Sequence, residues 1–469
     1  MLSLVYKILF ALSVILINPW GEDLDFIGTG RAEVWTYPKV SVVVLITAIN
    51  LWIIASPPRE KAKSTRFSQR RRIASGLWLA YLLAAAVSTL HSPFPAHSLL
   101  GHSVLGDGLL YWILIAGFVL TNTLALEVYP NLLEAQLGGV LLGGFILSLS
   151  IFPQVFDWRI DYTVTSGQVS SFNEELLESY IWRNQMPIGL YTNRGYAAYV
   201  LALTTCLSLI GLTKRTLSNR LMLGIVVATV LALLFTQIQA AIISFFAIAI
   251  YFLVNYYTKV EQTLQIPRKV VLILSALLIS LLSFQIYENY EALQADKLAE
   301  FSSSLEITLT GRLYLWKTAC QGILARPIWG WGFNGFGIAH LFVGDWQGQL
   351  GSFIPEGTVV NKVTALYETT FDYVSADGEL YSGVVFTHKA HNLVLDTLLS
   401  VGMIGFFCYS SLIVFYIWQL ATSNLSSYLM TVVLYLLFTV TWYETAQFTH
   451  LFWWTLSFGL SQRTPSKGD

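Results

Sequence analysis

The stretch His388-Lys389-Ala390-His391-Asn392-Leu393-Val394-Leu395-Asp396 joins a polar segment to a long apolar run, 390–419. A helix needs ~20 mostly apolar residues to cross a bilayer, and this run exceeds that length. Titratable groups are costly at membrane depth, so histidines at the mouth of such a helix indicate a functional site. The stretch therefore predicts a membrane protein whose chemistry lies at an interface.

The composition agrees with this class. Of the 469 residues, 55% are hydrophobic and only 12% are charged, whereas a soluble domain carries about 25% charged residues. The formal net charge of -1 gives no preference for polyanions. We therefore expect a lipid bilayer as the environment and no nucleic acid as a partner.

Apolar segments recur along the whole chain. We predict an all-α polytopic membrane protein with about twelve transmembrane helices and a large, partly helical extracytoplasmic insertion between helices nine and ten. The expected helices cover 2–18, 39–56, 73–91, 107–126, 133–152, 194–213, 220–237, 239–257, 269–287, 390–419, 427–443 and 447–461.

The basic residues set the expected orientation. Lys and Arg gather in the loops after helices two, six and eight, which are alternate loops and so share one face. By the positive-inside rule that face is the cytoplasm, and both termini lie there. The expected organisation is helices one to nine in 1–287 with an external loop at 153–193, an extracytoplasmic insertion at 288–389, and helices ten to twelve with a cytoplasmic tail in 390–469.

The insertion contains a predicted helix that Thr310-Gly311-Arg312 opens, with Thr310 as its N-cap. Arg312 would then lie in the first turn, where a cation is electrostatically unfavourable. This position indicates either a function for Arg312 or a pairing with Glu306 or a lipid phosphate.

A glycine-rich run, 330–337, follows this helix and contains the pattern GxGxxG. The dinucleotide interpretation needs a strand before the run and a helix after it, but here a helix and Pro327 precede it. The glycines are expected instead to let the backbone turn and approach a ligand or another helix. The segment 344–387 is compatible with a lid or an irregular loop.

His388 and His391 are three residues apart, so we expect them to share a helix face. Asp396 lies about 140° around the axis from His391, which disfavours a direct pair. His91, His97 and His102 lack the spacing of a helical metal pair. No metal or other cofactor is expected, with Asp23 and Asp25 in the first external loop as a weak alternative for a divalent cation.

Two groups of motifs carry a family resemblance. The first is Gly311-Arg312, Trp316, Arg326-Pro327, Gly330-x-Gly332 and Gly335, followed by His391-Asn392-x-x-Leu395 and Gly402-x-x-Gly405; the second is the run Gly189 to Tyr199. Together they resemble the bacterial O-antigen ligase and polymerase family, which covers lipopolysaccharide ligases, exopolysaccharide polymerases and protein O-oligosaccharyltransferases. The resemblance extends over about 190–410.

The resemblance implies an enzyme of the bacterial plasma membrane, with its active site on the outer, periplasmic face. It implies transfer of a glycan from an undecaprenyl-pyrophosphate (polyprenyl) carrier to a hydroxyl of a lipid, polysaccharide or protein acceptor, without a metal. Arg312 and Arg194 would bind the diphosphate, because a guanidinium binds phosphate oxygens bidentately and stays protonated. A neutral His391 would act as the base or position the acceptor, and Asn392 would orient its imidazole. Helix capping or anchoring at the membrane interface is the alternative role for His391. The other residues expected to bind substrate are Asn193, Trp316, Gly332 and His388.

The sequence departs from the family where its members usually carry Ser-Arg, because Ile238-Gln239 stands there. Arg194 is a candidate replacement for the missing cation. Two other functions stay open at this point. A multi-pass transporter is one, although the polar residues crowd one face rather than the midplane. A catalytically silent scaffold of polysaccharide assembly is the other.

Overall fold

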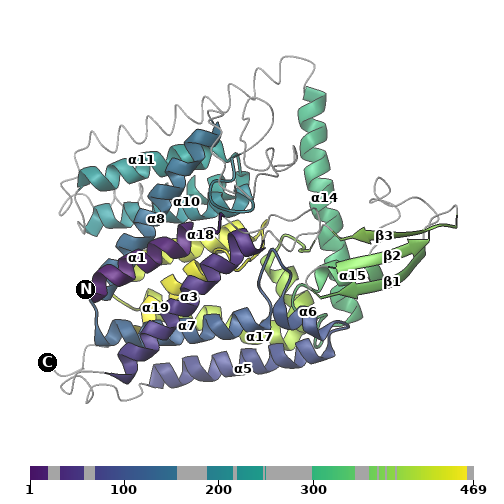
Figure 1. The fold of residues 1–469 in the computed structure, drawn as a ribbon, viewed down its shortest axis with the longest axis horizontal. Coiled ribbons are helices and arrows are strands. Elements are labelled where there is room, and N and C mark those ends of the chain that lie inside the picture. Colours follow the sequence, from purple (N-terminus) through teal and green to yellow (C-terminus); the bar gives the residue numbers. More distant parts are fainter. Residues whose placement is uncertain are drawn as a thin grey trace.

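The computed structural model is mostly helical (Figure 1). It describes residues 1–19, 32–56, 69–155, 187–214, 219–246 with 249, 298–343, 359–366, 369–374, 378–385 and 388–461. The helices are α1 (Leu2–Ile15), η1 (Ala32–Thr36), α3 (Tyr37–Ala55), α5 (Gln69–His91), α6 (Pro95–Leu100), α7 (Leu109–Val128), α8 (Leu132–Val155), α10 (Arg194–Lys214), α11 (Asn219–Phe235), α14 (Leu298–Ala325), α15 (Phe336–Val343), α17 (Leu393–Ala421), η3 (Ser426–Tyr428), α18 (Leu429–Thr439) and α19 (Thr449–Ser461).

Within the described residues, six helices are long and apolar enough to span a membrane, and three shorter apolar helices accompany them. A multi-pass membrane protein is therefore confirmed, whereas the predicted count of twelve is not. The predicted helix 269–287 lies outside the described residues, and so do most residues of 239–257 beyond 246.

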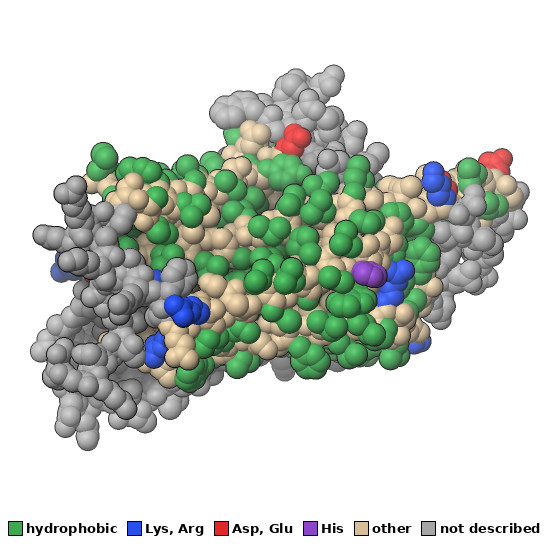
Figure 2. All heavy atoms as spheres, turned by 90° about the horizontal axis from the view of Figure 1, so that it is seen from below, with side chains coloured by type: hydrophobic (Ala, Val, Ile, Leu, Met, Phe, Trp, Pro, Cys, Tyr) green, Lys and Arg blue, Asp and Glu red, His purple; other side chains and the backbone are tan. Residues whose placement is uncertain are grey.

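Figure 2 shows one side of the molecule covered largely by hydrophobic side chains, with Lys and Arg near its two ends. Large apolar side chains of the spanning helices, such as Trp52, Phe407 and Trp418, are exposed on the protein surface, as expected for contact with lipid.

Small residues let the helices approach closely. A Cβ atom added at Gly139 of α8 would lie 2.4 Å from the carbonyl oxygen of Lys7 in α1. One turn later, a Cβ at Gly143 would lie 2.8 Å from the carbonyl oxygen of Ala11. Lipid chains are as apolar as side chains, so such backbone contact is a main source of helix association in a membrane.

The prediction of an all-α fold is wrong in one region. Strands β1 (Val359–Ala365), β2 (Thr369–Val374) and β3 (Leu380–Val384) form an antiparallel sheet in the order β1-β2-β3. Phe371 of β2 is buried against Leu341 of α15 and Val385. The alternating β-branched and aromatic residues of these strands favour the pleated conformation, and the scattered Gly and Asp between them obscured that pattern.

The predicted start of a helix at Thr310 is also wrong. Helix α14 runs without interruption from Leu298 to Ala325, so Thr310 and Gly311 lie inside it and Arg312 lies near its middle. The electrostatic argument about a cation in the first helical turn therefore does not apply. The position of Arg312 has to be explained by its tertiary contacts.

A break in α17 organises the region around the site. Gly402 has φ 65° and ψ -176°, which interrupts the helix. The carbonyl groups of Leu399 and Ser400 accept hydrogen bonds from the backbone N–H groups of Trp331 (2.8 Å) and Gly332 (2.9 Å). Met403 N donates in turn to the carbonyl of Pro327 at 2.9 Å. The segment 327–332 thus pairs with backbone groups that the break leaves unpaired.

The glycines of this segment have the role expected of them, because they turn the chain against another helix. Gly330 and Gly332 have φ values of 70° and 89°, in the left-handed region that glycine adopts readily. A Cβ at Gly330 would lie 2.5 Å from the carbonyl oxygen of Leu399. The pattern GxG is therefore a docking element for α17 and not a nucleotide site.

We predict that Gly402→Ala lowers the thermal midpoint of the purified protein, because Ala at this φ and ψ costs about 1–3 kcal/mol in backbone strain. The new Cβ would also lie 2.1 Å from the carbonyl oxygen of Ile328. The matched control is Gly76→Ala in α5, where no atom lies within 4 Å of the added Cβ. Equal midpoints for the two variants in a fluorescence-detected melt would contradict the role of the break.

Candidate active site

His391 lies in the short segment before α17, next to two aromatic rings. Its ring meets Tyr443 edge-on at 4.5 Å between centroids, and Trp442 edge-on at 5.7 Å. The Nδ1 atom lies 3.1 Å from the carbonyl oxygen of Lys389. A carbonyl only accepts, so Nδ1 carries the proton in this hydrogen bond and a neutral ring keeps its lone pair on Nε2. That arrangement suits a general base.

The electrostatic surroundings keep this imidazole neutral. Burial and, after it, the positive charge of Arg312 lower the pKa of His391 to about 3. Both causes disfavour the protonated form. His391 is therefore neutral at physiological pH, with its Nε2 lone pair unprotonated.

Arg312 approaches the same aromatic pair from α14. Its guanidinium carbon lies 5.4 Å from the ring centroid of Trp442, in a cation–π contact. The Nη1 atom is buried and has no hydrogen-bond partner among the described residues. Residues 312 and 391, which are far apart in sequence, thus meet at Trp442, and an unpaired guanidinium N–H is available there for an anion.

Trp442 and Tyr443 were missed by the sequence analysis. Helix α18 ends at Thr439, so these residues lie in the linker to α19 and not in a helix that reaches 443. Their rings are parallel within 6° and 5.8 Å apart. The sequence shows only two neighbouring aromatic residues near a helix end, which is the ordinary pattern of a membrane-interface belt.

The first turn of α10 packs against this pair. A Cβ at Gly195 would lie 2.1 Å from the Trp442 ring, and Tyr196 donates a hydrogen bond from its hydroxyl to that of Tyr443 at 3.0 Å. Asn193 accepts the N–H of Gly195 at 2.8 Å and so holds the start of the helix. The half-buried Arg194 stands in the same turn. The structure thus brings the 193–196 turn to the aromatic pair.

Asn392 has a backbone role. Its side-chain oxygen accepts the N–H groups of Val394 and Leu395, both at 3.1 Å, and caps α17. Its amide nitrogen donates to the carbonyl of Val440 at 2.9 Å. The amide is occupied by these bonds, so Asn392 ties α17 to the linker and does not hydrogen-bond the imidazole. Because Asn392 is the cap, helix capping also does not account for His391.

Of the remaining predicted site residues, Trp316 lies on the same helix as Arg312, whereas Gly332 and His388 have other contacts. Trp316 follows Arg312 by one turn of α14, and its indole N–H is buried without a hydrogen-bond partner among the described residues. Gly332 packs against Ser92 and Ser98 and belongs to the segment 327–332, which pairs with the break in α17. His388 lies against His102, with ring centroids 3.7 Å apart. The expectation that the two histidines share a helix face is wrong, because α17 begins only at Leu393.

The buried histidines do not form a metal centre. His97, His102 and His388 lie near one another, and burial lowers the pKa of each, to about 3 for His388. Among the residues that the structure describes, no group of His, Cys, Asp and Glu is arranged to hold a metal ion. Asp23 and Asp25 lie outside the described residues.

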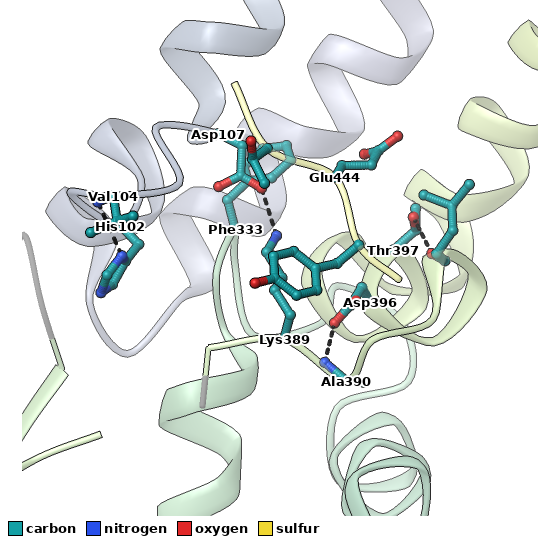
Figure 3. Close-up of polar contacts among 12 residues, drawn as sticks. His102, Val104, Asp107, Phe333, Lys389, Ala390, Asp396, Thr397 and Glu444 are labelled. Atoms are coloured by element: carbon teal, nitrogen blue, oxygen red, sulfur yellow. Dashed lines mark hydrogen bonds and ion pairs between the residues drawn. The ribbon is translucent and has the colours of Figure 1, made fainter. Parts of the chain in front are cut away.

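A second polar cluster lies beneath the histidine segment and was also missed (Figure 3). It lines a small pocket, here called the lower pocket, and contains Asp107, Lys389, Asp396 and Glu444. Lys389 and Asp107 form a buried ion pair at 2.6 Å. Glu444 accepts hydrogen bonds from Tyr409 and Tyr435, and burial raises its pKa to about 7. Asp107 and Glu444 are far in sequence from Lys389 and Asp396, so only the tertiary fold shows the cluster.

These features define a multi-pass membrane protein with an imidazole, a guanidinium and an aromatic pair gathered next to the start of α17. A protein-family model described as O-antigen ligase matches residues 223–410, which confirms the predicted family resemblance. The matched region contains Arg312, Trp316, Gly332 and His391, whereas Arg194 and Trp442 lie outside it. No curated protein matches the chain.

We predict that the imidazole of His391 stays neutral as the pH falls through 6.5, the ordinary pKa of histidine, because its own pKa is lowered to about 3. Histidine-selective ¹⁵N NMR of the protein in micelles measures this directly. The signal is assigned by its loss in His391→Ala. A titration of that signal near pH 6.5 would show that the site is more hydrated than the structure indicates.

Proposed function

We propose that the protein transfers a glycan from a polyprenyl-pyrophosphate carrier to an acceptor hydroxyl, at the outer face of the bacterial plasma membrane. The observation that supports this most directly is the convergence of Arg312 and His391 on Trp442, at 5.4 Å and 5.7 Å from its ring. The family match supports a glycan-transferring ligase or polymerase in general terms. The donor, the acceptor class and the membrane face belong to the proposal.

The chemistry follows from the two groups. Nε2 of His391 takes the proton of the acceptor hydroxyl while the hydroxyl oxygen attacks the anomeric carbon of the donor sugar. The bond from that carbon to the pyrophosphate oxygen breaks, and its electron pair leaves with the polyprenyl diphosphate. Arg312 stabilises the negative charge of the leaving diphosphate, because its buried N–H has no competing partner within the described structure. Arg194, in the turn that packs on Trp442, is the second candidate cation.

Aromatic side chains next to these groups suit a carbohydrate substrate. Trp442 and Tyr443 present a parallel pair of partly exposed rings beside His391. The indole N–H groups of Trp316 and Trp442 are both buried without a partner among the described residues. Because an indole nitrogen only donates, both suit oxygen-rich ligands such as a sugar or a phosphate. We propose that these residues bind the donor.

The decisive experiment mixes the purified protein with a polyprenyl-pyrophosphate glycan and candidate lipid, polysaccharide and peptide acceptors, and follows the product by mass spectrometry. We expect transfer that persists in excess chelator, because the proposed step uses only protein groups. Arg312→Ala should lower the rate on the order of 10²-fold, as removal of a preorganised charge donor does. Arg220→Ala, which removes an exposed arginine of α11, is the control. Loss of transfer in chelator would overturn the metal-free mechanism.

We further predict that His391→Ala lowers transfer by about 10²- to 10⁴-fold, the usual contribution of a general base. The matched control is His91→Ala, because His91 is exposed at the end of α5 and is not in contact with the aromatic pair. Both variants should melt at similar temperatures. Full transfer by a folded His391→Ala protein would exclude His391 as the base.

A further inference from the structure

The backbone at His391 has an unusual conformation. Its φ is 56°, in the left-handed region that residues with a Cβ seldom adopt. Neighbouring peptide groups have to hold such a conformation in place. Here one side chain binds the backbone N–H groups of the residues before and after His391.

That side chain is Asp396, in the first turn of α17. One carboxylate oxygen accepts the N–H of Ala390 at 2.6 Å, and the other accepts the N–H of Asn392 at 3.4 Å. The two hydrogen bonds bracket His391. The first holds the peptide group between Lys389 and Ala390, whose carbonyl oxygen faces the imidazole, and the second holds the peptide group between His391 and Asn392. Figure 3 shows Asp396 directed at the backbone of Ala390.

Lys389 provides a second anchor on the same loop. Its ammonium group forms the buried ion pair with Asp107 at 2.6 Å. Its carbonyl oxygen faces Nδ1 of the imidazole at 3.1 Å. The ion pair thus fixes the residue whose carbonyl sets the orientation of the ring.

Asp396 itself does not contact the reacting groups. It is buried among the residues of the lower pocket, with Lys389, Thr397 and Glu444. The imidazole lies instead against Trp442 and Tyr443. The charge of Asp396 also acts on Arg312 without contact, so the effect of Asp396 that depends on its hydrogen bonds passes through the position of His391.

We propose that Asp396 is a positioning residue, which holds the His391 loop in its left-handed conformation so that Nε2 faces the acceptor. This inference rests on the proposed function of His391 as the base. It assigns to the carboxylate a task that the spacing of five residues from His391 does not reveal.

The test is a double-mutant cycle with Asp396→Asn and His391→Ala, using the purified full-length protein and the glycan-transfer assay. Asn keeps the shape of the side chain but can accept only one of the two N–H bonds. We expect Asp396→Asn to lower kcat by about ten- to a hundredfold, because small misplacements of a catalytic group have effects of that size. KM should stay within about twofold, because the donor contacts are untouched.

The His391→Ala background distinguishes a positioning role from a general structural role of Asp396. There, Asp396→Asn should cause no further loss of the residual transfer, because the group that it positions is already absent. The control is Glu127→Gln, which replaces a carboxylate far from the His391 loop that forms an ion pair with Arg71 at 3.2 Å. It should leave kcat unchanged in both backgrounds, even where it lowers the thermal midpoint.

Each outcome separates the two claims. An unchanged kcat in folded Asp396→Asn, or an equal loss in both backgrounds, would overturn the positioning role and leave His391 as the base. Wild-type transfer by His391→Ala would overturn the proposed function of His391 itself. Should Asp396→Asn fail to fold, Asp396→Glu, which keeps both acceptor oxygens on a longer chain, takes its place in the same cycle and is read in the same way.

Discussion

The exchange of backbone hydrogen bonds between the break in α17 and the segment 327–332 is the constraint on which the site depends. A broken helix leaves N–H and C=O groups unpaired, and in a membrane protein these groups are costly unless other backbone satisfies them. Here Trp331, Gly332 and Met403 make those bonds. Since 327–332 follows directly after α14, the same contact fixes the end of the helix that carries Arg312 relative to the helix that follows His391.

This constraint explains why the motif residues have such different roles. Gly330 and Gly402 are structural, because each lets two backbones approach within a distance that a Cβ would prevent, and Gly332 is structural because it leaves room for the side chains of Ser92 and Ser98. Arg312 and His391 carry the charge and the lone pair. Asn392 and Asp396 hold the backbone around His391. Asn392 caps α17, and Asp396 accepts two backbone N–H groups. A family signature of this kind therefore records a loop geometry as much as a set of reacting groups.

Much of this arrangement could be predicted from the sequence, and the failures have physical reasons. Hydropathy identified the described spanning helices to within a few residues, because a bilayer demands long apolar runs. The motifs also singled out Arg312 and His391, which the structure brings together. Trp442 and Tyr443 were missed because an aromatic pair near a helix end has the same sequence pattern whether it faces lipid or a substrate. The sheet 359–384 was missed because glycine and aspartate interrupt short strands whose stability comes from packing on α15.

The left-handed turn at His391 also resolves an electrostatic conflict. A base beside a guanidinium must be neutral, and the nearby carboxylates would favour its protonation if they reached it. The turn separates the two environments, because Lys389 points to Asp107 in the lower pocket while His391 points to the aromatic pair. Burial alone would lower the pKa of Lys389, but Asp107 and Asp396 outweigh it and hold that pKa above its usual value. The carboxylates are thus directed toward a permanent cation, and the imidazole shares its surroundings with Arg312 alone as a charged neighbour among the groups that shift its pKa.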